Sequence, residues 1–134
     1  MKPSVWVLRE AVLALHEQLL AAFGGSSGLR GAGLLDSALA RPETLLAYGE
    51  PTLFDLAGTY AFGLVKNHPF VDGNKRIGFT VAILFLELNG HRFEAAEADA
   101  VIQTLRLAAG DTKAPEFAAW LKTHSKRAKP SKQG

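Results

Sequence analysis

One polar loop holds the residue types that could do chemistry. It runs from His68 to Arg76 and contains Asp72, Gly73 and Lys75. The loop leads directly into an apolar segment that we expect to be helical, and the first N–H groups of a helix have no hydrogen-bond partners within it. Their partial positive charge favours a bound phosphate. The position of the loop therefore predicts an anion-binding site.

The individual residues suit phosphate chemistry. Gly73 lets the backbone approach a ligand without a Cβ in the way, and Lys75 and Arg76 add two cations. Asp72 offers a hard carboxylate to Mg²⁺, which usually binds through one or two carboxylates plus substrate phosphates. His68 can accept a proton near neutral pH. Together these residues predict phosphoryl or nucleotidyl transfer, although each alone is also typical of a turn, a cap or a solvated helix end.

The elements that position this loop are helices. Apolar residues recur at helical spacing, and no segment alternates like a strand for long. Gly24 and Gly25 end the first helix, Pro42 ends the second, and Thr52 and Asp55 form an approximate capping box for the third. The expected helices cover residues 8–23, 34–40, 52–66, 75–88, 95–108 and 115–124.

The helix after the polar loop differs from the others. Asn74 is its predicted N-cap, and the residues from Ile77 to Leu88 leave it almost no polar face. A helix that is apolar all round is a buried, central one. In contrast, residues 24–33 contain five glycines and are expected to form a flexible loop.

Composition limits the class of protein. A chain of 134 residues suits one compact domain. The absence of cysteine excludes disulfides, thiolate zinc sites and a cysteine nucleophile, and it fits a reducing cytoplasm. No secretory signal is evident at Met1, and no apolar run is long enough to span a bilayer. We therefore expect a cytoplasmic protein without a membrane partner.

The positive net charge comes from the end of the chain. The last ten residues carry four cations and no acid, namely Lys126, Arg127, Lys129 and Lys132. Without that charge of +4, the total of +2 becomes −2 for residues 1–124. We expect residues 1–124 to form the domain and residues 125–134 to be a basic, disordered tail. Nucleic-acid binding is not expected, except through a partner protein.

The polar loop also resembles a family signature. His68, Phe70, Asp72, Gly73, Asn74 and Arg76 match the Fic pattern H-x-F-x-[D/E]-G-N-G-R-x-x-R. Lys75 replaces the second glycine and Phe79 the last arginine, as in the Doc ("death on curing") variant H-x-F-x-D-x-N-K-R. Softer similarities extend over nearly the whole chain. The sequence thus resembles the Fic/Doc superfamily, and most closely its Doc-type toxins.

This resemblance implies a fold and a set of site residues. The fold is an all-α, single-domain bundle of about six helices, with a buried central helix after the active-site loop. His68 is the implied base and Asp72 the Mg²⁺ ligand, while Lys75 and Arg76 complete the catalytic set. The implied nucleotide-binding residues are Lys66, Phe70, Gly73, Asn74, Lys75 and Arg76. Of these, Phe70 is expected to anchor the loop in the core.

The resemblance also implies an activity and partners. Doc-type toxins transfer the γ-phosphate of ATP to a hydroxyl group of elongation factor Tu, inhibit translation and are neutralised by a Phd-like antitoxin. Lys75 favours this reaction, because a side chain there obstructs the pose in which Fic enzymes transfer AMP. A Fic-type nucleotidyl transferase and an inactive binding module are the alternatives. The target, its modified residue, the antitoxin and the oligomeric state stay open.

Two further expectations concern the surroundings of the loop. The glycine-rich segment with Leu34, Leu35 and Asp36 resembles the flap that covers the target peptide in this family. His16, on the first helix, is expected to be a packed or surface histidine rather than a catalytic one. No self-inhibitory helix motif is evident, so restraint by a separate antitoxin is the natural expectation.

Overall fold

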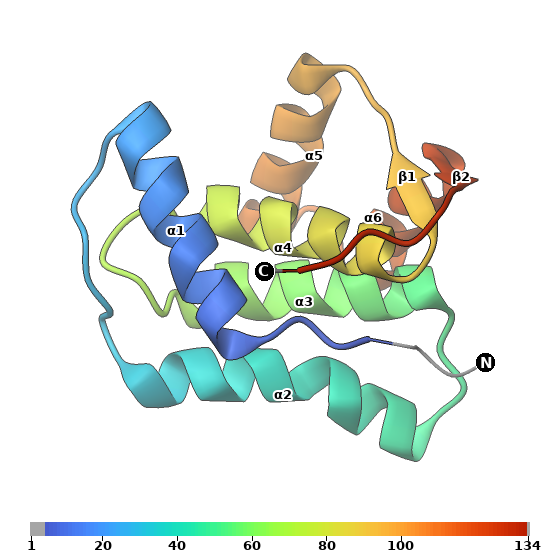
Figure 1. Cartoon of the computed structure of the whole chain (residues 1–134), viewed down its shortest axis with the longest axis horizontal. Helices are drawn as coiled ribbons and strands as arrows, with labels where there is room; N and C mark the ends of the chain where they lie inside the picture. The colour runs from blue at the N-terminus through green and yellow to red at the C-terminus, as the bar shows by residue number, and fades with distance from the viewer. Residues whose placement is uncertain (1–4, 134) are drawn as a thin grey trace.

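The computed structural model describes residues 5–133 and consists of six helices and one short two-stranded sheet (Figure 1). The all-α class and the number of helices agree with the prediction. Within residues 5–133, no helix is both long and apolar enough to cross a membrane. The elements are α1 (Arg9–Phe23), α2 (Ala32–Tyr48), α3 (Leu53–Asn67), α4 (Asn74–Leu88), β1 (His91–Phe93), α5 (Glu97–Ala109), α6 (Ala114–Thr123) and β2 (Ser125–Arg127).

Helices α3 and α4 form the centre of the molecule, with α2, α5, α6 and α1 packed around them (Figure 1). From Ile77 to Leu88, α4 has no fully exposed residue, which confirms the prediction of a buried central helix. Gly78 allows close packing, because a Cβ there would lie 2.9 Å from a methyl carbon of Val65 and 3.2 Å from the carbonyl oxygen of Ala61. This close packing of α3 against α4 holds the two ends of the connecting loop, residues 68–73, in fixed positions.

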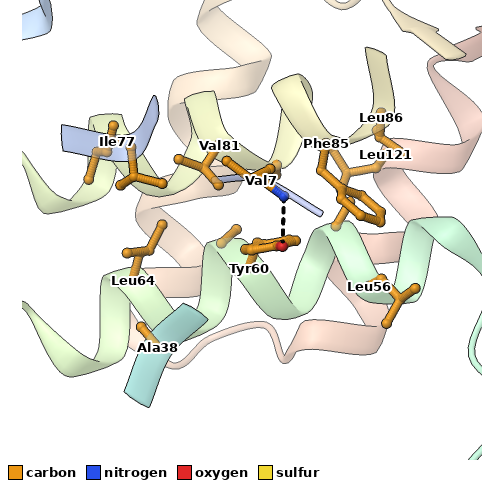
Figure 2. Packing of buried hydrophobic residues seen from close by; sticks show 14 of the residues in the cluster. Val7, Ala38, Leu56, Tyr60, Leu64, Ile77, Val81, Phe85, Leu86 and Leu121 are labelled. Atoms are coloured by element: carbon orange, nitrogen blue, oxygen red, sulfur yellow. Dashed lines mark hydrogen bonds between the residues drawn. The ribbon is translucent and has the colours of Figure 1, made fainter. Parts of the chain in front are cut away.

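A buried polar contact joins the core between these helices to the segment before α1 (Figure 2). Tyr60 is 1% exposed, and its ring lies 5.2 Å from that of Phe85. Its hydroxyl oxygen accepts a hydrogen bond from the Val7 N–H at 3.2 Å, as the dashed line in Figure 2 marks. Burial raises the pKa of Tyr60 to about 12. This contact fixes the segment before α1 on the central pair.

Helix α2 differs from the prediction, because it continues through Pro42 to Tyr48. Proline cannot donate to the carbonyl of Ala38, four residues earlier, and it costs about 3 kcal/mol in a helix interior. Leu35, Ala38 and Pro42 lie on one buried face, whose packing compensates for this cost. A Cβ at Gly63 would lie 3.1 Å from the Ala38 oxygen, so glycine on α3 lets the two helices pack closely at this turn.

The other predicted boundaries are close to the observed ones. Thr52 Oγ1 accepts from the Asp55 N–H at 3.1 Å, and an Asp55 carboxylate oxygen accepts from the Thr52 N–H at 2.9 Å. This confirms the capping box that begins α3. Gly24, with φ of 83°, ends α1 as predicted.

The predicted disordered tail is not what the structure has. Strand β2 pairs antiparallel with β1, so that Phe93 lies opposite Ser125. Three-residue strands are too short for an alternating pattern to reveal them. Beyond the sheet, the Ser131 N–H donates to the Glu87 oxygen at 2.8 Å. The end of the chain therefore folds back over α4.

Gln133 continues this return path. Its side-chain amide donates to the Trp6 oxygen at 3.0 Å and accepts from the Leu8 N–H at 3.2 Å. The C-terminal segment thus lies beside the start of α1, as Figure 1 also shows. These hydrogen bonds hold residues 125–133 against the domain, although their composition predicted a solvated tail.

Candidate active site

A cleft with a volume of about 560 Å³ opens at the amino end of α4. The site loop and the first turn of α4 form one side, and mostly apolar residues of α1 and α5 form the other. The lining residues are Leu19, Phe23, His68, Asp72, Gly73, Asn74, Lys75, Arg76, Phe79, Thr80, Glu97, Ala100, Val101, Thr104 and Leu105. The cleft therefore brings together His68, Asp72, Lys75 and Arg76, as predicted from the sequence.

His68 occupies a strained position at the end of α3. With φ of 53° and ψ of 55°, it is the only non-glycine residue with positive φ among residues 5–133. Its N–H donates to the Leu64 oxygen at 3.2 Å, while its side chain is exposed and lines the cleft. A left-handed conformation costs a non-glycine residue roughly 1–2 kcal/mol. This strained conformation turns the chain from α3 into the site loop.

Gly73 makes the second sharp turn, with φ of 80° and ψ of 18°, and it is the N-cap of α4. The first hydrogen bond into the helix runs from the Ile77 N–H to the Gly73 oxygen at 2.9 Å. The amides of Asn74, Lys75 and Arg76 precede that bond and lie in the first turn, where N–H groups have no partner within the helix. These amides make the amino end of α4 suitable for an anion.

Asp72 lies beside this turn with an exposed carboxylate. One carboxylate oxygen accepts from the Gly73 N–H at 2.9 Å, and the other accepts from the Ser26 N–H at 3.2 Å. Within residues 5–133, no group of three His, Cys, Asp or Glu side chains could hold a metal ion. A metal held by Asp72 would therefore need oxygen ligands from a substrate or from water, which is the usual situation of Mg²⁺.

The two cations of the site have different surroundings. The Arg76 guanidinium carbon lies 4.4 Å from the centre of the Phe23 ring, which fixes the side chain above an aromatic face. Lys75 is exposed and has no ion-pair partner within the described part of the chain. Its charge is thus available to a ligand in the cleft.

Three residues that were predicted to contact the nucleotide either lie outside the cleft or have a side chain bonded within the loop. Phe70 is 2% exposed and does not line the cleft, in agreement with its expected role as an anchor. The Asn74 side chain accepts from the Phe70 N–H and donates to the Phe70 oxygen, both at 2.9 Å. Asn74 is therefore not the N-cap of α4, and its amide side chain closes the loop from within. Lys66 is exposed on α3, outside the lining of the cleft.

His16, on α1, is a packed histidine that contacts the buried side of the site loop. It is 2% exposed, and its ring stacks on Phe70 with centroids 3.7 Å apart and an angle of 13° between the planes. Its Nε2 lies 2.7 Å from the Asp72 backbone oxygen. The sequence placed His16 on a helix but gave no sign of this contact, because 56 residues separate it from Asp72.

The glycine-rich segment lies against the site loop. Leu29 and Phe70 form an isolated antiparallel bridge, and the Val71 N–H donates to the Gly28 oxygen at 3.0 Å. Leu34, Leu35 and Asp36 belong to the first turns of α2 instead, and Leu35 is fully buried. The segment is thus a loop, as predicted, whose end at α2 comes earlier than expected.

The opposite wall of the cleft comes from α5. Glu97, Val101, Thr104 and Leu105 line it, although no sequence motif marks them. They are more than 20 residues from the loop in sequence, so only the packing of α5 against α4 brings them there. Helical periodicity could have placed them on one face, but it could not have assigned that face to the cleft.

Comparison with known proteins identifies relatives of this chain by sequence. The model of the family described as "Fic/DOC family" matches residues 6–86, which is more than half of the chain. The protein named "Toxin Doc" of Mycolicibacterium smegmatis is 44% identical over 77 residues, which cover 55% of this chain and 58% of the relative. "Protein kinase doc" of Escherichia phage P1 is 35% identical over 82 residues, covering 60% and 65%. Both matches span less than two thirds of the relative's own length.

Proposed function

Because the chain belongs to the Fic/DOC family, we propose that it is a Doc-type toxin that transfers the γ-phosphate of ATP to a hydroxyl group of a target protein. The observation that carries this proposal is that His68, Asp72, Lys75 and Arg76 line the same cleft at the amino end of α4. The printed names of the two relatives support it, since one is called a toxin and the other a protein kinase.

His68 is the proposed general base. Its exposed ring lines the cleft, and a ring nitrogen would accept the proton of the target hydroxyl group. As that proton leaves, the hydroxyl oxygen bonds to the γ-phosphorus, the bond to the β-phosphate oxygen breaks, and ADP departs. In phosphoryl transfer the protein contributes mainly positioning and charge stabilisation, which the surrounding residues supply.

The first turn of α4 is the proposed phosphate cradle. The amides that precede the Ile77–Gly73 hydrogen bond face no helical acceptor, and the charges of Lys75 and Arg76 lie beside them. Preorganised donors of this kind stabilise charge that develops in a transition state. Glycine suits position 73, since its φ of 80° is left-handed.

Asp72 is the residue that would hold Mg²⁺. Its carboxylate oxygens are hard ligands, and the hydrogen bonds from Gly73 and Ser26 leave lone pairs free on both. The ion would neutralise charge on the bound phosphates. A single carboxylate suits a metal that binds together with its nucleotide, because Mg²⁺ usually takes its remaining ligands from substrate phosphates and water.

Lys75 supports phosphate transfer over AMP transfer. Its exposed side chain stands where a second glycine would leave room for an α-phosphate close to the helix. An ammonium group at that point can instead hold polyphosphate charge. A Fic-type nucleotidyl transferase would need the space that Lys75 takes.

The proposed target class is a translation factor, elongation factor Tu, and the proposed partner is a Phd-like antitoxin in the cytoplasm. The rim of the cleft suits a covering partner segment, because Phe23 is 63% exposed, Val101 53% and Leu105 48%. Exposed apolar groups clustered around a cleft are typical of a surface that another molecule covers. A segment that folds on binding could wrap such a surface.

The test uses purified protein, bacterial lysate or purified elongation factor Tu, Mg²⁺, and ATP labelled in either the α- or the γ-phosphate. The proposal requires that only the γ-label reaches protein, and that transfer stops when Mg²⁺ is chelated. Transfer of the α-label would establish nucleotidyl transfer instead. Transfer of neither label would favour a binding module.

A further inference from the structure

Arg30, in the segment between α1 and α2, reaches across to the carboxyl end of α3. Its Nε donates to the His68 oxygen at 2.8 Å, and its Nη2 donates to the Asn67 oxygen at 2.9 Å. Arg30 has no carboxylate partner within residues 5–133, so its guanidinium group is committed to these two successive carbonyls. The two contacts span 38 and 37 residues of sequence.

The carbonyls at the end of a helix lack partners within it, and a cation there is favourable. At this helix end the need is greater, because His68 has φ of 53°, a region that non-glycine residues rarely adopt. A strained backbone conformation of this kind persists only where several contacts from the surrounding structure hold it in place. The fork of the Arg30 guanidinium thus holds the carbonyl oxygens of the two peptide bonds that precede and follow the His68 Cα.

Arg30 is itself fixed in place. Its N–H donates to the Pro69 oxygen at 2.6 Å, beside the bridge between Leu29 and Phe70. The Asn67 side chain is held separately, since it accepts from Arg41 at 3.1 Å and donates to the Leu34 oxygen at 3.0 Å. Removal of the Arg30 side chain should therefore free the His68 carbonyl while the end of α3 stays anchored to α2.

We propose that Arg30 is a positioning residue, which holds the His68 backbone in the left-handed conformation that presents its side chain to the cleft. The proposal rests on the assignment of His68 as the base. Arg30 does not line the cleft, so it acts through His68 and not on the nucleotide. A small misplacement of a catalytic group can cost about 100-fold in rate.

Kinetics separate positioning from binding. Arg30→Ala should lower kcat by roughly 10- to 100-fold and leave the KM for ATP within about twofold, because the phosphate cradle is untouched. Arg30→Lys should recover part of the loss, since one ammonium can reach a carbonyl but lacks the planar fork. Arg9→Ala is the matched control, as Arg9 is a partly exposed arginine bonded to Asp36, and it does not line the cleft. It should leave both constants unchanged.

A double-mutant cycle tests whether the effect passes through His68. In a His68→Ala background, Arg30→Ala should cause no further loss of the residual rate, because the group that Arg30 positions is already gone. Equal losses in both backgrounds would overturn the proposal. A rise in the KM for ATP with unchanged kcat would do the same.

Carbon-13 chemical shifts of the His68 backbone provide a readout that needs no activity. In Arg30→Ala they should move from left-handed toward extended values, with intermediate shifts in Arg30→Lys and wild-type shifts in Arg9→Ala. Unchanged His68 chemical shifts in folded Arg30→Ala would refute the proposal that Arg30 positions His68. If wild-type protein transfers no label but the shifts move as expected, the proposed function fails while the structural role of Arg30 stands.

Discussion

The Nε2 atom of His16 lies 2.7 Å from the backbone oxygen of Asp72. A carbonyl oxygen only accepts hydrogen bonds, so Nε2 must carry the proton. The same ring stacks on Phe70 at 3.7 Å, and it is almost fully buried. Helix α1 thereby holds the site loop through one stacked ring and one hydrogen bond, next to the carboxylate proposed to bind the metal.

Separating these two contacts gives the first prediction. His16→Phe keeps a ring on Phe70 but leaves the Asp72 oxygen without its donor, which should lower the free energy of unfolding by about 1–3 kcal/mol. His16→Ala should cost more, because the ring is lost as well. Both variants should lower γ-label transfer. Denaturant unfolding and the transfer assay check this, and wild-type activity in folded His16→Phe would contradict a role for the hydrogen bond.

Asp72→Asn should remove the enhancement of ATP binding by Mg²⁺. The amide oxygen can still accept from the Gly73 N–H, whereas the amide NH₂ group cannot accept from the Ser26 N–H as the carboxylate does. Asparagine also lacks the charge that a hard cation prefers. Calorimetric titration of ATP with and without Mg²⁺ measures the effect. Asp111→Asn is the control, since Asp111 is exposed and does not line the cleft. An undiminished Mg²⁺ effect in Asp72→Asn would assign the metal to other ligands.

The buried Tyr60 predicts a pH dependence of stability. Burial raises its pKa to about 12, above the ordinary value of 10.0, so the unfolded chain loses this proton first as the pH rises. Stability is therefore complete below pH 10 and declines between pH 10 and 12, by about 1.4 kcal/mol for each unit of pKa difference. Tyr60→Phe should remove this part of the decline.

The chain has two tyrosines, and the second provides the control. Tyr48 is 89% exposed, so Tyr48→Phe should leave the alkaline decline as in wild type. Denaturant unfolding at several alkaline pH values measures the difference between the two variants. Identical pH profiles for Tyr60→Phe and wild type would show that Tyr60 ionises normally in the folded protein.

The apolar rim of the cleft predicts how a neutralising partner binds. Val101 is exposed here and would be covered by the partner. Val101→Glu should therefore weaken the affinity of a co-expressed antitoxin by about tenfold or more, because it places a charge in a contact that the partner buries. Tyr48→Glu changes an exposed residue outside the cleft and should bind the partner normally. Calorimetry with the product of the adjacent small gene tests this. Equal affinities would place the partner elsewhere, and unimpaired growth on expression of this chain alone would oppose the toxin proposal.

Local signals predicted the parts of this fold that depend on neighbouring residues. The capping box of Thr52 and Asp55, the glycine that ends α1 and the largely apolar segment of α4 could be predicted, because each involves residues within a few positions of one another. The residues of the proposed anion site could be identified for the same reason. Its cations, its carboxylate and the start of α4 are contiguous.

Features that depend on distant residues were missed. Pro42 lies within α2 because packing against α3 outweighs a local cost, and Gln133 is ordered by contacts with Trp6 and Leu8. The Arg30 contacts with the end of α3 also join segments far apart in sequence. No periodicity encodes such pairs, so they emerge only from tertiary packing.

The most direct test of the central claim is the rate of γ-label transfer by His68→Ala under the conditions used for wild type. Loss of a general base costs ~10²- to 10⁴-fold in rate, and the fold should survive because the His68 side chain is exposed. His91→Ala, a histidine outside the cleft, should transfer the label normally in the same assay. We predict wild-type melting and a loss of at least 100-fold for His68→Ala. A folded His68→Ala protein that transfers the γ-label at the wild-type rate would contradict the account.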